Sequence, residues 1–151
     1  MPKIVLNIII NAPIKVVFDL ARSIDFHKES VKQTKEKAVA GKTSGLIGLG
    51  ESVTWKAKHL GVWQKLESKI TEFDFPNFFV DEMQKGIFKS FKHTHKFEMI
   101  NVSKTKMIDV FDYKSPFGVL GKFADWLFLK KYMTNFILNR NLLIKNKAEK
   151  T

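Results

Sequence analysis

Cysteine is absent from this sequence, which excludes disulfide bonds and metal sites built from thiolates. The absence is typical of proteins that work in a reducing compartment, so we expect a cytoplasmic location. No apolar run approaches the ~20 residues that a membrane-spanning helix needs. The apolar start of the chain is short and ends at Asn11-Ala12-Pro13, and we therefore expect no secretory signal peptide.

Acidic residues are scarce relative to basic ones, because 15 Asp and Glu stand against 26 Lys and Arg and give a net charge of +11. A charge of this sign can indicate nucleic acid or an anionic membrane as a partner. The lysines are spread along the whole chain rather than clustered, which is typical of a solvated surface. We therefore expect no nucleic-acid partner.

Hydrophobic residues, by contrast, make up 44% of the 151 positions, and aromatic residues 13%. A chain of this size and composition can form a single domain, residues 1–151, with a sizeable core. Phenylalanine occurs 14 times and tyrosine twice. Phenylalanine adds bulk without a hydroxyl that needs a hydrogen-bond partner, so the preference favours apolar packing.

Hydrophobic periodicity and turn residues divide the chain into regular elements. Alternation and β-branched residues predict strands at 3–11, 35–40, 51–60, 62–73, 78–84, 88–99 and 104–114. Helical spacing predicts short helices at 13–21 and 23–30, which Asn11 and Ser23 are expected to cap, and a long helix over about 119–147. The basic end of the long helix is expected to project or fray.

The order of these elements predicts an α+β fold. Consecutive strands joined by short turns pair antiparallel. An antiparallel sheet that exposes one face to solvent buries its opposite face against another element. The last helix is large enough to cover that buried face. We therefore expect a seven-stranded antiparallel sheet wrapped around a long C-terminal helix, with two short helices after the first strand.

Several short stretches resemble one family when they are taken in order. They are Gly45-Leu46-Ile47-Gly48-Leu49-Gly50-Glu51, Val53-Thr54-Trp55, His59-Leu60-Gly61, Asp81-Glu82-Met83, Gly86-Ile87-Phe88, His93-Thr94-His95-Lys96-Phe97, Met107-Ile108-Asp109, and Tyr113 with Pro116 and Gly118. The sequence resembles the START-like (SRPBCC) superfamily, which includes the birch-pollen-allergen-type proteins, and within it a bacterial polyketide cyclase/dehydrase-like or cell-division-inhibitor-like subgroup. The resemblance implies a helix-grip fold with an apolar cavity. Members differ widely in activity, so no reaction is implied.

Strand alternation places polar side chains among the residues that face the helix. Two sets remain open for 78–84, Phe79/Asp81/Met83 and Phe78/Val80/Glu82, because each contains an acid. The inward sets of 88–99 and 104–114 are Phe91, His93, His95, Phe97 and Met99, and Thr105, Met107, Asp109, Phe111 and Tyr113.

The register of the last hairpin brings a histidine beside a carboxylate. A three-residue turn at 101–103 sets Ile100 opposite Lys104, and His95 then lies opposite Asp109 and His93 opposite Phe111. A shift of two residues would place His93 opposite Asp109 instead. In either register the groups are within hydrogen-bond reach. They form either a satisfied polar pair in the core or an anchor or acid–base pair for a ligand.

The inward residues define the expected ligand cavity, for which no cofactor is expected. Candidates for catalysis within it are His93, His95, Asp109 and Tyr113. The complete expected set is Trp55, Leu66, Phe79, Phe91, His93, His95, Phe97, Met107, Asp109, Phe111, Tyr113, Phe123 and Leu127.

Two other sites are disfavoured. The triplet Gly41-Lys42-Thr43 lacks the glycine five residues earlier and the helix directly after it that a phosphate-binding loop requires. His93 and His95 share a face, and Asp109 could supply a third metal ligand, but no motif of known metal spacing supports such a site. We therefore expect no bound metal.

Together these features favour a binding module that carries or senses a small hydrophobic molecule, of lipid-like, aromatic or polyketide type. One alternative is a cyclase/dehydrase-like enzyme that uses the inward His–Asp pair, although no nucleophile motif is present. Another is docking to a membrane surface or a partner through 123–138, which is apolar on more than one face and carries Lys130 and Lys131. We expect a monomer or a homodimer.

Overall fold

A computed structural model describes residues 3–30, 35–59, 61–115 and 128–150. Its strands form one antiparallel sheet in the order β1-β7-β6-β5-β4-β3-β2. The elements are β1 (Lys3–Ile10), α1 (Ile14–Ala21), α2 (Ile24–Ser30), β2 (Lys37–Gly41), β3 (Ser52–His59), β4 (Val62–Asp74), β5 (Phe78–Lys85), β6 (Ser90–Asn101), β7 (Lys104–Lys114) and α4 (Lys130–Glu149).

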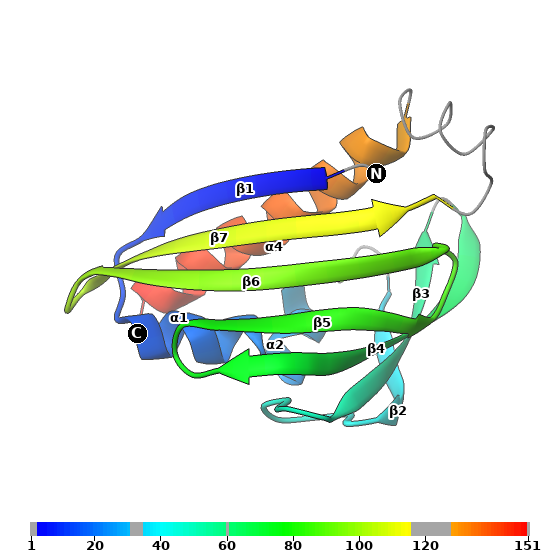
Figure 1. Cartoon of the computed structure of the whole chain (residues 1–151), viewed down its shortest axis with the longest axis horizontal. Helices are drawn as coiled ribbons and strands as arrows, with labels where there is room; N and C mark the ends of the chain where they lie inside the picture. Colours follow the sequence, from blue (N-terminus) through cyan, green and yellow to red (C-terminus); the bar gives the residue numbers. More distant parts are fainter. Residues whose placement is uncertain (1–2, 31–34, 60, 116–127, 151) are drawn as a thin grey trace.

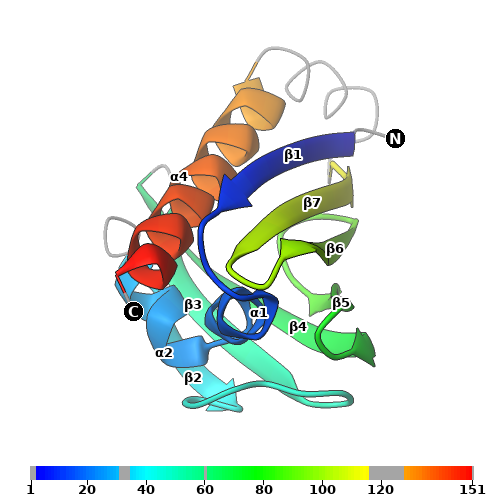
Figure 2. The same ribbon diagram turned by 90° about the vertical axis from the view of Figure 1, so that its left-hand side faces the viewer.

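The sheet curves around α4, which lies along its concave side (Figures 1 and 2). The helix contacts the edge strand β1, and α1 and α2 pack against the same helix. The chain thus has the predicted helix-grip arrangement: a seven-stranded antiparallel sheet, two short helices after the first strand, and a long helix near the C-terminus.

The two short helices begin differently from one another. Ser23 caps α2 as predicted, because its Oγ accepts a hydrogen bond from the Phe26 backbone N–H at 3.1 Å. The predicted cap of α1 is wrong: Pro13 occupies the N-cap position, and no side chain caps the helix. Pro13 has an extended backbone, with φ −62° and ψ 146°, so the helix begins after it and Asn11 lies too far upstream to cap it. Its backbone N–H donates to the Glu149 carboxylate instead, at 2.8 Å.

The β6–β7 hairpin has the predicted register along most of its length, with His95 opposite Asp109 and His93 opposite Phe111. At the tip the prediction is wrong, because an irregularity between Met99 and Asn101 sets Asn101 rather than Ile100 opposite Lys104. Met99 was also predicted to face inward but is 60% exposed. The tip extends beyond the helices that cover the sheet (Figure 1), so alternation there no longer leads to burial.

The C-terminal part of α4 is tied to the body of the protein. Lys145 Nζ donates to the Ile9 carbonyl at 2.8 Å and to Glu149 Oε2 at 2.7 Å, and Ala148 is buried. The expectation that the basic end projects or frays is therefore wrong for this part of the helix. The predicted segment 119–127 lies outside the described residues.

Two clusters of buried apolar side chains fix the helices on the sheet. One gathers around α1, where the Phe18 ring contacts those of Phe79 and Phe97 at centroid distances of 5.3 and 5.0 Å. The other joins Ile137 of α4 to β6 and β7. Residues of both clusters, among them Trp55 and Phe91, also face a space between the sheet and the helices. Within the described part of the chain, no helix is long and apolar enough to cross a bilayer.

Candidate functional site

A cavity of about 390 Å³ lies between the inner face of the sheet, α2 and α4. Its volume falls in the ordinary range for sites that take small molecules. Aromatic side chains make up much of its wall: Trp55, Phe79, Phe88, Phe91, Phe111, Phe128, Tyr132 and Phe136. Aliphatic side chains such as Ile47, Val53, Leu66 and Ile137 fill the spaces between them. Most of the surface that an occupant would meet is therefore apolar.

The structure brings together part of the predicted cavity set. Trp55, Leu66, Phe79, Phe91, His93, His95 and Phe111 line the cavity. Phe97, Met107, Asp109 and Tyr113 are buried but are not among its lining residues, and Phe123 and Leu127 lie outside the described residues.

Some residues on the inner face of the sheet do not line the cavity, because other elements pack over them. Phe97 and Met107 belong to the apolar cluster around α1. Tyr113 is fully buried beside Phe88, with ring centroids 5.6 Å apart, and belongs to the cluster that includes Ile137. Strand alternation gives the face of the sheet but not which part of that face is left uncovered.

All four histidines of the sequence, at 27, 59, 93 and 95, line this cavity. Strand alternation predicts His93 and His95 on the inner face, and no pattern in the sequence singles out His27 as a cavity residue. His27 lies on α2 and its ring packs against that of Trp55 at a tilt of 52°, with ring centroids 4.5 Å apart. The cavity wall therefore holds every imidazole of the chain, and an imidazole can donate or accept a hydrogen bond or bind a metal.

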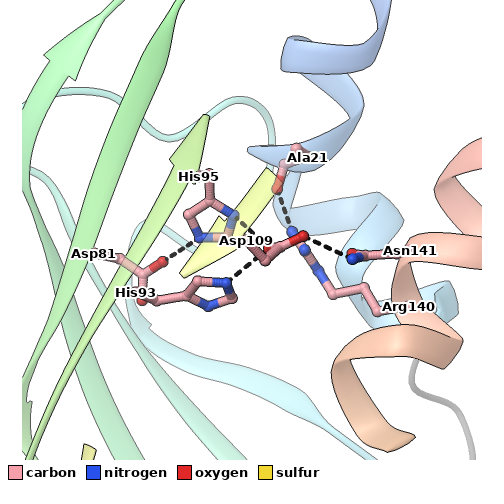
Figure 3. A network of polar contacts seen from close by, with 7 residues as sticks. All are labelled: Ala21, Asp81, His93, His95, Asp109, Arg140 and Asn141. Carbon is pink, nitrogen blue, oxygen red and sulfur yellow. Dashed lines mark hydrogen bonds and ion pairs between the residues drawn. The ribbon is translucent and has the colours of Figure 1, made fainter. Parts of the chain in front are cut away.

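Figure 3 shows a buried polar cluster at the cavity wall, formed by Asp81, His93, His95, Asp109, Arg140 and Asn141. His93 Nε2 lies 2.8 Å from Asp109 Oδ1, and His95 Nε2 lies 2.7 Å from Asp81 Oδ2. The opposed pair His95 and Asp109 is less close, with Nδ1 and Oδ1 3.5 Å apart. Each histidine thus has its own carboxylate partner, and for Asp109 the partner is the diagonal neighbour.

Asp109 is held from two sides. Asn141 Nδ2 donates to Asp109 Oδ2 at 2.6 Å, while His93 contacts the other carboxylate oxygen. Burial by itself would raise the pKa of Asp109, but the hydrogen bond from His93 and the nearby charges of His93, His95 and Arg140 outweigh it and lower the pKa to about 2. Asp109 is therefore a carboxylate at neutral pH and can only accept hydrogen bonds.

The same balance acts on the second pair. Burial penalises the imidazolium and, with repulsion from His93, lowers the pKa of His95 to about 4 despite the attraction of Asp81 and Asp109. Burial would raise the pKa of Asp81, but the hydrogen bond from His95 and the charges around it lower that pKa overall. At neutral pH His95 is a neutral imidazole that donates from Nε2 to an ionised Asp81.

Two further residues, Arg140 and Asn141, reach the cluster from α4 and were not predicted to belong to the site. The guanidinium of Arg140 is buried, and its Nη2 donates to the Ala21 carbonyl at 2.6 Å. The signal was present in the helix pattern, because these polar residues interrupt a buried stripe that continues through Ile137 and Ile144. A polar position in a buried stripe needs a partner, and here the partners lie on β7 and α1.

A second polar group lines another part of the cavity. His59 Nδ1 lies 2.7 Å from Tyr132 Oη, and His27 Nε2 lies 3.0 Å from Glu36 Oε1. Burial lowers the pKa of His59, and burial together with the charge of Glu36 raises the pKa of Tyr132. These side chains are less deeply buried than Asp109 and His95.

Three residues of the buried cluster offer metal-ligand atoms within 4.8 Å of one another: Asp81, His93 and His95. The set considered from the sequence had Asp109 as the third ligand. The structure places Asp109 behind His93, outside the cavity lining, and places Asp81 beside both histidines. Alternation left open which acid of β5 faces inward. The structure shows that it is Asp81, which pairs across the strands with His93.

No family model matches the sequence, and a search of curated proteins also finds no match. Solved structures are similar over nearly the whole chain. A protein from Thermus thermophilus is 19% identical with a TM-score of 0.79, and the match covers 97% of each chain.

Two further matches carry informative descriptions. A START superfamily protein from Mycobacterium smegmatis is 10% identical with a TM-score of 0.75, over 98% of this chain and 97% of that one. The Zhui aromatase/cyclase from Streptomyces sp. R1128 is 9% identical with a TM-score of 0.66, over 94% and 93%. At these identities the likeness establishes a shared fold.

Proposed function

We propose that this chain, which has the helix-grip fold of START-like proteins, binds a small aromatic or otherwise hydrophobic molecule in the cavity between the sheet and α4, as a carrier or sensor. The observation that carries the proposal is the cavity itself, with its mainly apolar wall and a few polar groups, the most deeply buried of which form the cluster of Figure 3. Sites for small molecules usually combine apolar walls with a few placed polar groups, which give orientation and specificity.

The wall favours a ligand with an aromatic face. Phe79 and Phe91 come from neighbouring strands, while Phe136 and Tyr132 approach from α4. Aromatic rings pack on one another in offset or edge-to-face arrangements that contribute about 0.5–1.5 kcal/mol beyond the burial of area. A planar apolar ligand gains such contacts from both sides of the cavity.

His93 supplies an anchor for a polar substituent. Because ionised Asp109 only accepts, His93 Nε2 must carry the proton of their hydrogen bond. In the neutral imidazole, Nδ1 is then an acceptor, and His93 lines the cavity. A ligand hydroxyl or N–H that donates to this atom would be held in one orientation.

A neutral fluorescent probe, N-phenylnaphthylamine, tests the proposal. We expect its emission to rise on binding, and we expect Leu66→Trp to weaken binding about tenfold or more, equivalent to about 1.4 kcal/mol, because the indole occupies cavity volume. The matched control is Leu142→Trp on the exposed face of α4, which should leave the affinity unchanged.

Native mass spectrometry of the purified chain identifies any co-purifying molecule. An absence of probe binding to the folded wild type would contradict the proposal.

A cyclase/dehydrase-like enzyme is the second candidate, supported by the His93–Asp109 pair. A base held by a buried carboxylate, with its free nitrogen toward a cavity, is the arrangement of general acid–base catalysis. The aromatase/cyclase with a similar fold adds support from architecture alone. If the pair catalyses a reaction, Asp109→Asn should abolish conversion of the co-purifying molecule, followed by mass spectrometry, and leave probe binding partly intact. Equal conversion by wild type and variant would exclude this role.

A further inference from the structure

Asp81, His93 and His95 occupy one rigid corner of the cavity. Asp81 pairs with His93 across β5 and β6, and His95 lies two residues further along β6 on the same face. One ligand atom from each lies within 4.8 Å of the other two, and all three residues line the cavity. Neighbouring strands of a sheet hold side chains at nearly fixed separation, so the three groups stay together.

The donor set is chemically specific. Two imidazoles and one carboxylate suit divalent first-row transition metals such as Zn²⁺ and Fe²⁺, and three protein ligands leave coordination positions open. The cavity provides an entry path and the room for a further ligand on the open side.

The neighbours of these residues fit the same reading. Asp109 fixes the His93 ring through Nε2 and is itself held by Asn141, so the other ring nitrogen of His93 is left as a lone-pair donor. Metal-bound histidines usually donate their second N–H to a carboxylate in this way. His95 Nδ1 is buried and has no hydrogen-bond partner among the described residues.

The carboxylates of the cluster also suit a cation. The cluster holds two carboxylates, those of Asp81 and Asp109, and one guanidinium, that of Arg140. A buried carboxylate needs charged or hydrogen-bonding partners, and a bound cation is one such partner for Asp81. In this structure the partner of Asp81 is His95 Nε2, at 2.7 Å.

We propose that Asp81, His93 and His95 bind one divalent first-row transition-metal ion, with an open coordination position toward the cavity. The ion takes the place of the proton between His95 Nε2 and Asp81 Oδ2. That proton moves to His95 Nδ1, which lies 3.5 Å from Asp109 Oδ1, so the imidazole stays neutral. The site does not depend on the proposed organic ligand.

Cobalt is the probe, because Co²⁺ bound by nitrogen and oxygen ligands absorbs in the visible region. The untagged, chelator-treated chain is titrated with Co²⁺ by absorption spectroscopy and with Zn²⁺ by calorimetry. We expect one equivalent to bind, and we expect Asp81→Asn and His95→Gln to abolish the site. Asp109→Asn should weaken binding about 10–100-fold, the usual effect of a residue that orients a ligand. His27→Gln is the matched control: it removes a histidine of the same cavity, and the site should remain.

Wild type that shows no cobalt bands, or a site that survives both Asp81→Asn and His95→Gln, would overturn the proposal. Circular dichroism of each variant separates loss of the site from loss of the fold. N-phenylnaphthylamine binding by the metal-free wild type is measured in parallel. If the probe binds and the metal does not, the metal site fails while the proposed ligand-binding function stands. If the metal binds and the probe does not, the reverse holds.

Discussion

Asp109 connects the sheet to α4 through its two carboxylate oxygens. Oδ1 accepts from His93 on β6, and Oδ2 accepts from Asn141 on α4. The carboxyl group is 1% exposed, so each hydrogen bond replaces one that water would otherwise make. A buried carboxylate without these partners would be strongly disfavoured, and the cluster is therefore stable only as a unit.

Asn141→Leu tests this linkage. The substitution leaves Asp109 Oδ2 without its donor, and we expect it to lower the free energy of unfolding by about 1–3 kcal/mol, the cost of an unsatisfied buried polar group. The loss of Asn141 Oδ1, which itself has no hydrogen-bond partner among the described residues, offsets part of this. Urea denaturation measures the change. The control is Asn139→Leu, an exposed position two residues away, where we expect a change within about 0.5 kcal/mol. Equal effects at both positions would contradict the linkage.

Part of this residue-level arrangement was predictable. His93, His95 and Asp109 follow from strand alternation, because β6 and β7 are regular where they lie. The choice of partners did not follow: alternation and register set His95 opposite Asp109, whereas the close contact is between Asp109 and His93. Which histidine contacts Asp109 depends on side-chain torsions and on the hydrogen bond between His95 and Asp81. Neither can be read from the pattern of residues.

At the scale of elements, the edge pairing of β2 with β3 depends on a close approach of two backbones. Gly41 pairs with Val53 and has a positive φ of 73°, and a Cβ at this position would collide with the Ser52 carbonyl. That carbonyl also accepts a hydrogen bond from the Lys42 N–H at 2.7 Å. Glycine is required here both for its backbone conformation and for the space it leaves.

Gly41→Ala and Gly50→Ala form a matched pair that separates these two causes. Both glycines have positive φ, 73° and 80°, but a Cβ at Gly50 meets no atom within 4 Å. We expect Gly50→Ala to cost about 1–2 kcal/mol from backbone conformation alone, and Gly41→Ala to cost more. Thermal unfolding followed by circular dichroism ranks the two. The same loss in both variants would show that the contact with Ser52 has no energetic consequence.

At the scale of the whole molecule, the net charge of +11 and the exposed side of α4 bear on the prediction of a peripheral membrane contact. Lys130 and Lys131 are exposed at the start of α4. Phe128 just before the helix and Leu138 and Leu142 further along it are also exposed. Exposed apolar side chains beside lysines are typical of segments that lie on anionic membrane surfaces. The part of 123–138 that the structure describes, from 128 onward, thus has exposed apolar residues beside lysines, the feature on which the predicted membrane contact depends.

Co-sedimentation with phosphatidylserine-containing vesicles tests the contact. We expect binding at low salt that weakens as salt rises, because the Debye length falls to about 10 Å at 0.1 M. The double variant Lys130→Glu/Lys131→Glu should reduce binding more than Lys56→Glu/Lys58→Glu on β3, which makes the same change in charge elsewhere. An equal loss of vesicle binding in the two double variants would assign the attraction to net charge alone. An absence of binding by the wild type at low salt would contradict the predicted membrane contact.

The sequence by itself determined the order of the elements, the antiparallel sheet and the histidines on its inner face. Each of these depends on short-range periodicity, in which one side chain's direction follows from its neighbours along the chain. Only the tertiary structure decided which part of the inner face is a cavity, because α1 covers Phe97 and Met107 while the middle of the sheet stays open. It also brought Arg140 and Asn141 to Asp81, His93, His95 and Asp109, since α4 reaches them only after the chain has closed around it.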